Sequence, residues 1–338
     1  MKALWKKHIL HFKRSAGTSR GSLMEKPSYL LYLQKEGRLG LGECSLLPGL
    51  SIDDKHDYEA QLDRFCRLWE SGCSAEELRL NFQKEWPSLW LGVEMAFLEL
   101  ENKEAGIYFP SLFASGRSGL LTNGLVWMGP DDYQWEQCQK LLENNFRCIK
   151  FKIGLDYFEK SEKLLQNLRD LSPDITIRVD ANGAFDFELA KKVLKSLKSL
   201  NVHSIEQPLS VGSWKETNDL VSEDLIPIAL DEDLIFCEQG REAELLATTE
   251  AQFIILKPSL LGGFERSDEW IDLAKENKMG FWVTSALEGN IGLQAIAQYA
   301  AVKEIRIPQG LGTGSLFLNN FPSDLEMQGE FLWKRIRE

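Results

Sequence analysis

The sequence of 338 residues lacks any apolar run of the roughly 20 residues that a bilayer-spanning helix needs. Its basic N-terminus, residues 1–17, interleaves apolar residues with Lys, His and Arg, so it has no signal-peptide core. Cations are also in the minority, because 39 Lys and Arg stand against 51 Asp and Glu, for a net charge of −12. Nucleic acids and anionic membrane surfaces need clustered cations, so neither is an expected partner.

Cysteine and histidine are sparse as well. The cysteines form no C-x-x-C pair and have no Cys/His metal-ligand spacing. Scattered free thiols in a chain of this length favour a reducing, cytoplasmic location, and we interpret them as structural. The six are Cys44, Cys66, Cys73, Cys138, Cys148 and Cys237. Three of the four histidines, His8, His11 and His56, lie in the N-terminal part of the chain. Their positions therefore support no His-based catalytic triad.

The N-terminal third shows an α+β pattern in which strands precede helices. Two apolar runs, residues 28–33 and 39–45, are separated by a polar turn and predict a β-hairpin. Helical patterns follow at residues 58–69, 75–86 and 88–100. Residues 14–22 are small and polar, and we interpret them as a mobile loop that closes as a lid over the substrate.

From about residue 120 onward, short strands alternate with amphipathic helices. The expected strands cover residues 120–126, 148–152, 175–180, 202–206, 226–231, 253–257, 280–284 and 304–307. Eight strands with helices between most of them are typical of a (β/α)8 barrel. We therefore predict an α/β protein with an α+β capping domain (1–110), a TIM-type barrel (111–315) and a C-terminal segment (316–338) that packs back on the cap.

Five consecutive expected strands end in a charged residue, at intervals of 25 to 28 residues. Strands often end in a charge simply because they end at the surface. Five in a row instead favour a ring of charges at the C-terminal mouth of a barrel, where barrel active sites lie. The five residues are Lys152, Asp180, Glu206, Asp231 and Lys257.

The residue types in this ring indicate a particular chemistry. Carboxylates that converge from neighbouring strands repel one another, and a hard divalent cation relieves the repulsion. Oxygen ligands without His or Cys favour Mg²⁺, or Mn²⁺ in its place, over zinc. A lysine close to such a cation and to a second lysine loses its proton more readily and can act as a base. Metal and lysine together suit removal of a proton α to a carboxylate.

Strand parity places two further side chains. Lys150 lies two residues before Lys152, so both point into the barrel mouth. Lys150 either lowers the pKa of Lys152 or pairs with a core carboxylate such as Asp180, and both alternatives stay open. His203 lies an odd number of residues before Glu206 and is expected to face the helices as a packing residue.

These strand ends resemble those of a known family. In chain order they read K-F-K at 150–152, V-D-A-N-G at 179–183, I-E-Q-P at 205–208, A-L-D-E at 229–232 and L-K-P at 256–258, with G-L-G-E at 40–43 and L-P-G-L-S at 47–51 in the cap. The whole set resembles the muconate-lactonizing-enzyme subgroup of the enolase superfamily. The resemblance implies a modified barrel and Mg²⁺ bound by Asp180, Glu206 and Asp231. It also implies Lys152 and Lys257 as the paired catalytic lysines.

Within this subgroup the chain is similar to the o-succinylbenzoate synthases. The similar segments are L-T-N-G-L at 121–125, S-A-L-E-G at 285–289 and G-L-G-T-G at 310–314. The acidic D-x-D element that dipeptide epimerases usually carry after the last strand is absent there. This similarity implies a carbon–oxygen lyase of menaquinone biosynthesis that converts 2-succinyl-6-hydroxy-2,4-cyclohexadiene-1-carboxylate to 2-succinylbenzoate by syn dehydration. Lys152, assisted by Lys150 and Lys257, would move the proton. Asn182, Ser285 and Gly312 are the expected substrate contacts.

Two alternatives remain at this point. The same two lysines suit an N-acylamino-acid racemase, or a related racemase or cycloisomerase of the superfamily, in which Lys152 and Lys257 exchange one α-proton between two faces. The other alternative is a barrel that binds a metal and a carboxylate without turnover. In each case the expected partner is a small carboxylate molecule, and no oligomeric state is implied.

Overall fold

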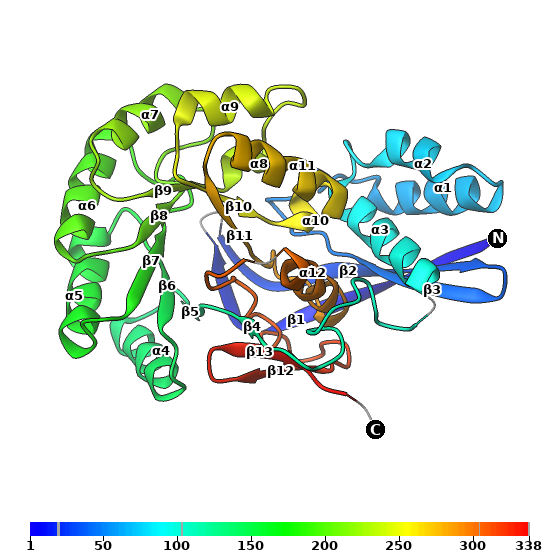
Figure 1. The fold of residues 1–338 in the computed structure, drawn as a ribbon, viewed down its shortest axis with the longest axis horizontal. Helices are drawn as coiled ribbons and strands as arrows, with labels where there is room; N and C mark the ends of the chain where they lie inside the picture. Colours follow the sequence, from blue (N-terminus) through cyan, green and yellow to red (C-terminus); the bar gives the residue numbers. More distant parts are fainter. Residues whose placement is uncertain (19–20, 103, 304, 337–338) are drawn as a thin grey trace.

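The computed structural model describes residues 1–18, 21–102, 104–303 and 305–336. Figure 1 shows an antiparallel sheet with three helices at one end of the molecule and a curled parallel sheet, covered by helices, at the other. The predicted α/β class, a barrel with an α+β cap, is confirmed. Within the described residues, no helix is both long and apolar enough to cross a membrane.

The cap consists of one sheet and three helices. Its strands are β1 (Lys2–Thr18), β2 (Gly21–Lys35) and β3 (Arg38–Cys44), and its helices are α1 (Tyr58–Glu70), α2 (Ala75–Phe82) and α3 (Pro87–Asn102). All strand pairs are antiparallel, in the order β1-β2-β3. The expected hairpin and the three expected helices are therefore present, and β1 is an additional strand.

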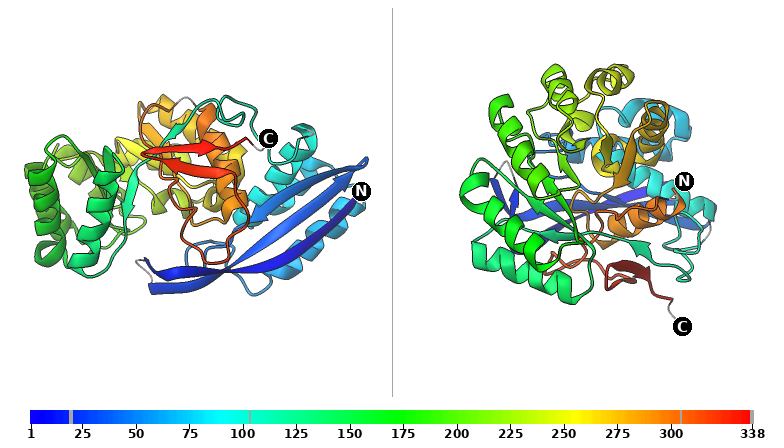
Figure 2. Two further views of the ribbon diagram at one scale, coloured as in Figure 1. Left: turned by 90° about the horizontal axis from the view of Figure 1, so that it is seen from below. Right: turned by 60° about the vertical axis from the view of Figure 1, so that its left-hand side comes forward.

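The prediction of a loop at residues 14–22 is wrong for the residues that the structure describes. Residues 14–18 belong to β1 and residues 21–22 to β2, while residues 19 and 20 lie outside the described part of the chain. The register of β1 against β2 shifts at an irregularity between His11 and Ala16. Beyond the shift the two strands pair again, with Ala16 opposite Leu23. Figure 2 shows this long hairpin extending along the barrel. Its predicted function as a lid stays a prediction.

Close backbone packing explains the G-L-G-E segment of β3. A Cβ atom on Gly42 would lie 1.7 Å from the carbonyl oxygen of Gly92 in α3, and one on Gly40 would lie 2.1 Å from that of Ala96. Both distances are far below van der Waals contact, so only glycine permits this approach. The close approach of α3 fixes the position of β3, including Glu43, which directly follows Gly42.

Asp53 predicts a pH dependence of cap stability. Its buried carboxylate accepts hydrogen bonds from the Ser88 backbone amide (2.9 Å) and the Ser88 hydroxyl (2.7 Å), at the start of α3. Burial raises the pKa of Asp53 to about 6, so the folded state holds this proton more tightly than the unfolded state does. The stability contribution of Asp53 therefore falls as pH rises from about 4 to about 6.

Replacement of Asp53 by asparagine removes this titration. We expect the free energy of unfolding of the variant, relative to the natural protein, to increase by about 2 kcal/mol between pH 4.5 and pH 7.5. Urea unfolding at both pH values measures the difference. The exposed Asp54, replaced in the same way, serves as the control. An equal shift in both variants would contradict the assignment to Asp53.

Seven parallel strands form the barrel wall, in the order β5 to β11. They are β5 (Gly124–Val126), β6 (Cys148–Lys152), β7 (Thr176–Asp180), β8 (Ser204–Glu206), β9 (Ile228–Leu230), β10 (Phe253–Leu256) and β11 (Gly280–Val283). The segments between and after them include α4 (Asp131–Glu143), a π-helical turn (Tyr157–Ser161), α5 (Glu162–Leu171), α6 (Phe187–Ser199), α7 (Trp214–Ser222), α8 (Glu232–Ile235), α9 (Glu242–Thr249), α10 (Pro258–Leu261), α11 (Gly263–Glu276) and α12 (Asn290–Val302).

Two of the eight expected barrel strands differ from the prediction. The first, residues 120–126, divides into β4 (Leu120–Leu121) and β5, because β4 pairs with a C-terminal strand instead of with the barrel. The eighth was expected at residues 304–307, but the described residues 305–307 form no strand, and residue 304 is not described. Isolated bridges at Gln309 and Gly310 close the barrel instead. Pro308 lacks an N–H group and cannot continue a ladder, which explains the late closure.

The C-terminal segment contacts both the cap and the barrel. The Lys13 amide donates to the Leu316 carbonyl (2.9 Å), and the Leu318 amide donates to the His11 carbonyl (2.8 Å), so residues 316–318 lie along β1. The last two strands, β12 (Leu325–Gln328) and β13 (Phe331–Lys334), form a hairpin, and β13 pairs with β4. The C-terminal segment therefore connects β4, which precedes the first barrel strand, with β1 of the cap.

Candidate active site

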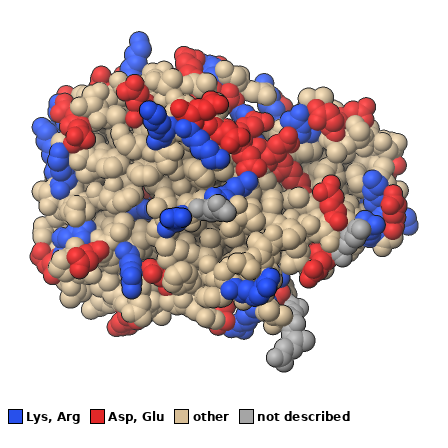
Figure 3. All heavy atoms as spheres, in the orientation of Figure 1, with Lys and Arg blue, Asp and Glu red and all other residues tan. Residues whose placement is uncertain are grey.

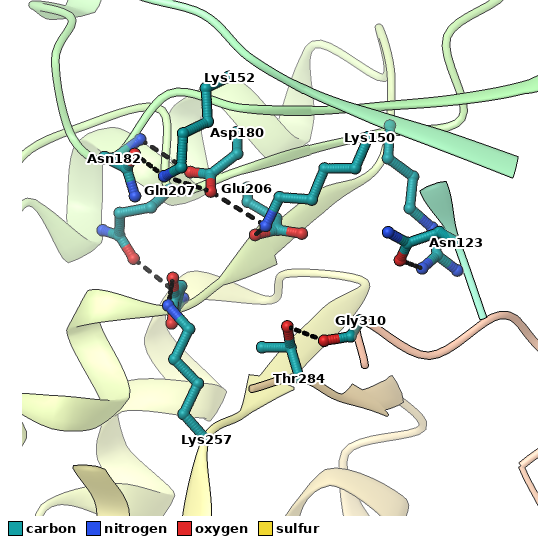
Figure 4. A network of polar contacts seen from close by, with 12 residues as sticks. Asn123, Lys150, Lys152, Asp180, Asn182, Glu206, Gln207, Lys257, Thr284 and Gly310 are labelled. Carbon is teal, nitrogen blue, oxygen red and sulfur yellow. Dashed lines mark hydrogen bonds and ion pairs between the residues drawn. The ribbon is translucent and has the colours of Figure 1, made fainter. Parts of the chain in front are cut away.

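Three of the predicted strand-end residues lie side by side because the strands that carry them pair in register. Lys152 at the end of β6 lies opposite Asp180 at the end of β7, which in turn lies opposite Glu206 at the end of β8. Asp231 and Lys257 directly follow β9 and β10. The C-terminal edge of the sheet thus gathers all five charged residues, as Figure 4 shows for the four that it labels.

Lys150 reaches the carboxylates from below this level. Its Nζ contacts Glu206 and lies 3.0 Å from Asp180 Oδ2. Burial opposes the charge on Lys150, but Asp180 and Glu206 outweigh it and raise its pKa, so it remains an ammonium group. Of the two alternatives given for Lys150, these contacts match the one in which it pairs with core carboxylates. A direct catalytic function of Lys150 stays a prediction.

Lys152 contacts two polar side chains, those of Asp180 and Asn182. Its Nζ lies 3.3 Å from Asp180 Oδ2 and donates to Asn182 Oδ1 at 2.6 Å. The Asn182 side chain in turn donates to Glu232 at 3.0 Å. Asn182 has a φ of 45°, a conformation that asparagine adopts more readily than most residues. The expected substrate contact Asn182 therefore also orients Lys152.

Lys257 approaches from the opposite side of the mouth. Figure 4 shows the amino ends of Lys152 and Lys257 directed toward each other. Lys257 forms an ion pair with Asp231. Burial opposes its charge, but Asp231 and Glu232 outweigh the burial and raise the pKa of Lys257. Lys257 is therefore suited to act as a fixed cation.

A cavity of about 110 Å³ lies between these lysines and the cap. The barrel side of its wall includes Lys150, Lys152, Asp180, Asn182, Glu232 and Lys257. The opposite side includes Leu47, Pro48 and Leu50 from the loop after β3, which the L-P-G-L-S segment supplies. The cap thus contributes an apolar wall that faces the charged groups, an arrangement that suits a ring with a carboxylate on one side.

The predicted substrate contacts Ser285 and Gly312 also line this cavity. The hydroxyl group of Ser285 is already occupied, because it donates to Glu288 (2.6 Å) and accepts from Thr313 (2.9 Å). Sequence reasoning missed Thr313, as well as Thr284, whose hydroxyl donates to the Gly310 carbonyl at 2.9 Å. Only the position of Thr284 at the end of an expected strand could have indicated it.

His203 lies away from these groups. Its Nδ1 is 2.9 Å from the Ser204 hydroxyl, and its ring is tilted by 33° against that of Phe253, with the ring centroids 5.5 Å apart. Burial, reinforced by the charge of Arg178, lowers the pKa of His203 to about 4. A neutral, packed imidazole agrees with the expected packing histidine.

The predicted metal ligands fit a hard cation in their chemistry. One oxygen of Glu206 and one of Asp231 are fully buried and have no hydrogen-bond partner among the described residues, and the same holds for Glu232. Buried carboxylate oxygens without a donor are costly unless a cation or proton satisfies them. The described residues do not form a closed three-ligand cluster as they stand, and each predicted ligand contacts a lysine.

Comparisons with known proteins give the family of the chain. Residues 135–324 match the family described as enolase C-terminal domain-like. The chain is 39% identical to the o-succinylbenzoate synthase of Desulfotalea psychrophila over 98% of both chains, and 28% identical to that of Vibrio cholerae over 87% of this chain and 84% of the other.

Solved structures give the same picture. The crystal structure of MenC from Desulfotalea psychrophila superimposes with a TM-score of 0.88 at 36% identity, covering 98% of this chain and 99% of the other. The L-Ala-D/L-Glu epimerase of Bacillus subtilis superimposes with a TM-score of 0.85 at 19% identity, covering 99% of this chain and 96% of the other. The second likeness, at its low identity, concerns the fold alone.

Proposed function

This chain belongs to the o-succinylbenzoate synthases within the enolase C-terminal domain-like family, and we propose that its cavity dehydrates 2-succinyl-6-hydroxy-2,4-cyclohexadiene-1-carboxylate to 2-succinylbenzoate. The chain is thus a carbon–oxygen lyase of menaquinone biosynthesis. The single observation that carries the mechanism is the pair Lys152 and Lys257, which enter the cavity from opposite sides. They offer a base on one face of the substrate ring and a cation on the other.

In the first step, Lys152 removes the proton α to the ring carboxylate. The C–H bond breaks, the proton passes to Lys152 Nζ, and the electron pair moves onto the carboxylate as an enediolate. Asn182 and Asp180 orient the Lys152 amine through their contacts of 2.6 Å and 3.3 Å. The ammonium group of Lys257 lies on the other face and stabilises the negative charge.

In the second step, the ring expels its hydroxyl group. The C–O bond breaks, and the ammonium group of Lys152 returns its proton to the leaving oxygen, so that water departs from the same face. The ring becomes aromatic, which makes the reaction strongly favourable. Leu47, Pro48 and Leu50 cover the ring and keep bulk water from the enediolate.

We propose Mg²⁺ as the cofactor, with Asp180, Glu206 and Asp231 as its ligands and Mn²⁺ as a substitute. The unpartnered buried oxygens of Glu206 and Asp231 support this assignment. A bound divalent cation would supply positive charge beside the substrate carboxylate. The residues around it then have only to hold the substrate and move the proton.

We also propose a cytoplasmic location and a small-molecule substrate rather than a nucleic acid. All six cysteines are free thiols, as expected in a reducing compartment. On the face shown in Figure 3, acidic side chains gather in a band while Lys and Arg are scattered. Such a surface repels polyanions.

The proposed function predicts a measurable preference between two reactions. We expect the purified protein with Mg²⁺ to dehydrate the cyclohexadiene substrate with kcat/KM on the order of 10⁴ M⁻¹s⁻¹ or higher. The opposed lysines also suit N-acylamino-acid racemization, so solvent deuterium should be followed into the α-carbon of N-acylamino acids in parallel. Rapid deuterium entry without dehydration would contradict the synthase and identify a racemase.

A further inference from the structure

The turn after β11 forms one wall of the cavity, and its backbone is strained. Ser285, Ala286 and Leu287 line the cavity. Leu287 has a φ of 63°, in the left-handed region that a side chain with a Cβ seldom adopts. A strained residue keeps such a conformation only when its surroundings impose it. The groups that impose this backbone conformation on Leu287 therefore also determine the shape of the cavity wall.

Glu43 of the cap holds the far end of this turn. It follows the glycines of β3 and is fully buried. One of its carboxylate oxygens accepts the Gly289 amide at 2.7 Å and the Ser28 hydroxyl at 2.8 Å, and the other accepts the Gly292 amide at 2.8 Å. These amides begin α12, where an anion is favoured by the orphan N–H groups and the helix dipole.

Lys26 of the cap holds the middle of the turn. Its side chain is fully buried, and its Nζ donates to the Leu287 carbonyl at 2.8 Å and to the Ser45 hydroxyl. The contact to Leu287 acts on the residue with the strained backbone. Glu43 and Lys26 lie on neighbouring strands of the same sheet, so one rigid element fixes both parts of the turn.

We propose that Glu43 and Lys26 are positioning residues through which the cap sets the substrate-facing wall formed by Ser285–Leu287. The proposal rests on the proposed function, because the wall is assigned to the substrate of that reaction. Neither side chain lines the cavity, so both act through the turn. The cap therefore determines substrate binding in two ways, by its own loop at Leu47–Leu50 and by the shape of the barrel turn.

Two glycines beside Glu43 leave its carboxylate room to reach the backbone amides. A Cβ atom on Gly289 would lie 2.8 Å from the Glu43 carboxylate, and one on Gly292 would lie 3.3 Å from it. The two glycines thus leave room for the carboxylate to reach both amides. Within the turn, Glu288 accepts the Ala286 amide at 2.9 Å. From the barrel side, the Ser285 amide donates to the Gly310 carbonyl at 3.0 Å, so the turn is held from both sides.

Replacement of Glu43 by glutamine tests the proposal with little change in volume. The side-chain amide retains one acceptor oxygen and turns its NH₂ group toward one of the backbone amides. We expect kcat/KM for the cyclohexadiene substrate to fall about 10- to 100-fold, mainly through a higher KM, because the barrel strands still hold Lys152 and Lys257. Lys26→Met is expected to act in the same direction.

Glu99→Gln is the matched control. Glu99 is also a largely buried carboxylate of the cap that accepts two backbone amides, those of Leu41 (2.5 Å) and Gly106 (2.6 Å), but it contacts neither the turn nor the cavity. We expect it to lower the melting temperature as Glu43→Gln does and to leave KM unchanged. The proposal would be overturned if KM rose in proportion to the loss of melting temperature in Glu43→Gln, Lys26→Met and Glu99→Gln alike.

Hydrogen exchange separates this proposal from the proposed function, because it needs no turnover. We expect Glu43→Gln to accelerate exchange at Gly289 and Gly292 and to weaken binding of the product 2-succinylbenzoate, measured by calorimetry with Mg²⁺ present. Faster exchange with unchanged product affinity would overturn the positioning role. If the natural protein bound 2-succinylbenzoate but showed no dehydration activity, the proposed function would be contradicted. The positioning role of Glu43 would then be decided by the product affinity of Glu43→Gln alone.

Discussion

Replacement of Lys152 by alanine is expected to lower kcat for dehydration by roughly 10²- to 10⁴-fold, the usual contribution of a general acid–base residue. Lys152 both accepts the α-proton and returns it to the leaving oxygen, so its loss removes both transfers. Asp180 and Glu206, two nearby carboxylates, are bound to Lys150, and His203 packs outside the cavity. Initial rates with the cyclohexadiene substrate measure the effect.

Lys160→Ala is the control for this substitution. Lys160 also forms an ion pair with an aspartate, Asp156 at 2.7 Å, but it is exposed and lies in the segment after β6 rather than in the cavity. We expect it to retain full activity. Binding of 2-succinylbenzoate to Lys152→Ala should persist, because the cap loop and the turn after β11 are unchanged. A variant with more than about one tenth of the natural kcat would show that Lys152 is not the base.

The barrel was predictable from the sequence because its signals are local. Each apolar strand and its following helix lie within one stretch of chain, and the charge at the strand end marks the edge where the active site forms. Strand β1 was not predictable in this way. Its Lys6, Lys7 and His8 interrupt the alternation of apolar residues, and its pairing with β2 is decided by contacts that extend past a register shift after His11.

The site was predictable where one strand carries the information and hidden where distant segments meet. The five charged residues follow from strand ends and their regular spacing alone. Glu43 carries no local signal for its contacts, because its partner Gly289 lies 246 positions further along the chain. Lys26 looks like a surface charge at the start of a strand, yet it is fully buried against Ser45 and the Leu287 carbonyl. The burial of Lys26 arises only when the cap and the barrel pack together, so the sequence around it does not indicate it.

Removal of divalent cations is expected to abolish activity. We expect excess EDTA to lower the rate by about 10³-fold or more, since the charge of the enediolate then lacks its strongest stabilisation. Added Mg²⁺ should restore the rate. Calorimetric titration of the stripped protein with Mg²⁺ measures binding without turnover. Full activity in EDTA would contradict a metal-dependent reaction.

Single carboxylate substitutions then assign the ligands. We expect Asp180→Asn, Glu206→Gln and Asp231→Asn each to weaken Mg²⁺ binding by at least about 100-fold. Asp233→Asn is the matched control, because both oxygens of this buried carboxylate already accept hydrogen bonds, one from the Gly212 amide (2.8 Å) and one from the Gln207 side chain (2.7 Å). Its Mg²⁺ affinity should not change.

Glu232 decides the third ligand. It follows Asp231 directly and, like Asp231, has one buried oxygen without a partner among the described residues. Unlike Asp231, it lines the cavity. The two differ in their second oxygen, which contacts Lys257 in Asp231 and Asn182 in Glu232. If Asp231 is the ligand, Glu232→Gln should retain Mg²⁺ affinity and instead disturb Asn182, the residue that orients Lys152. Loss of affinity in Glu232→Gln with none in Asp231→Asn would transfer the ligand to Glu232.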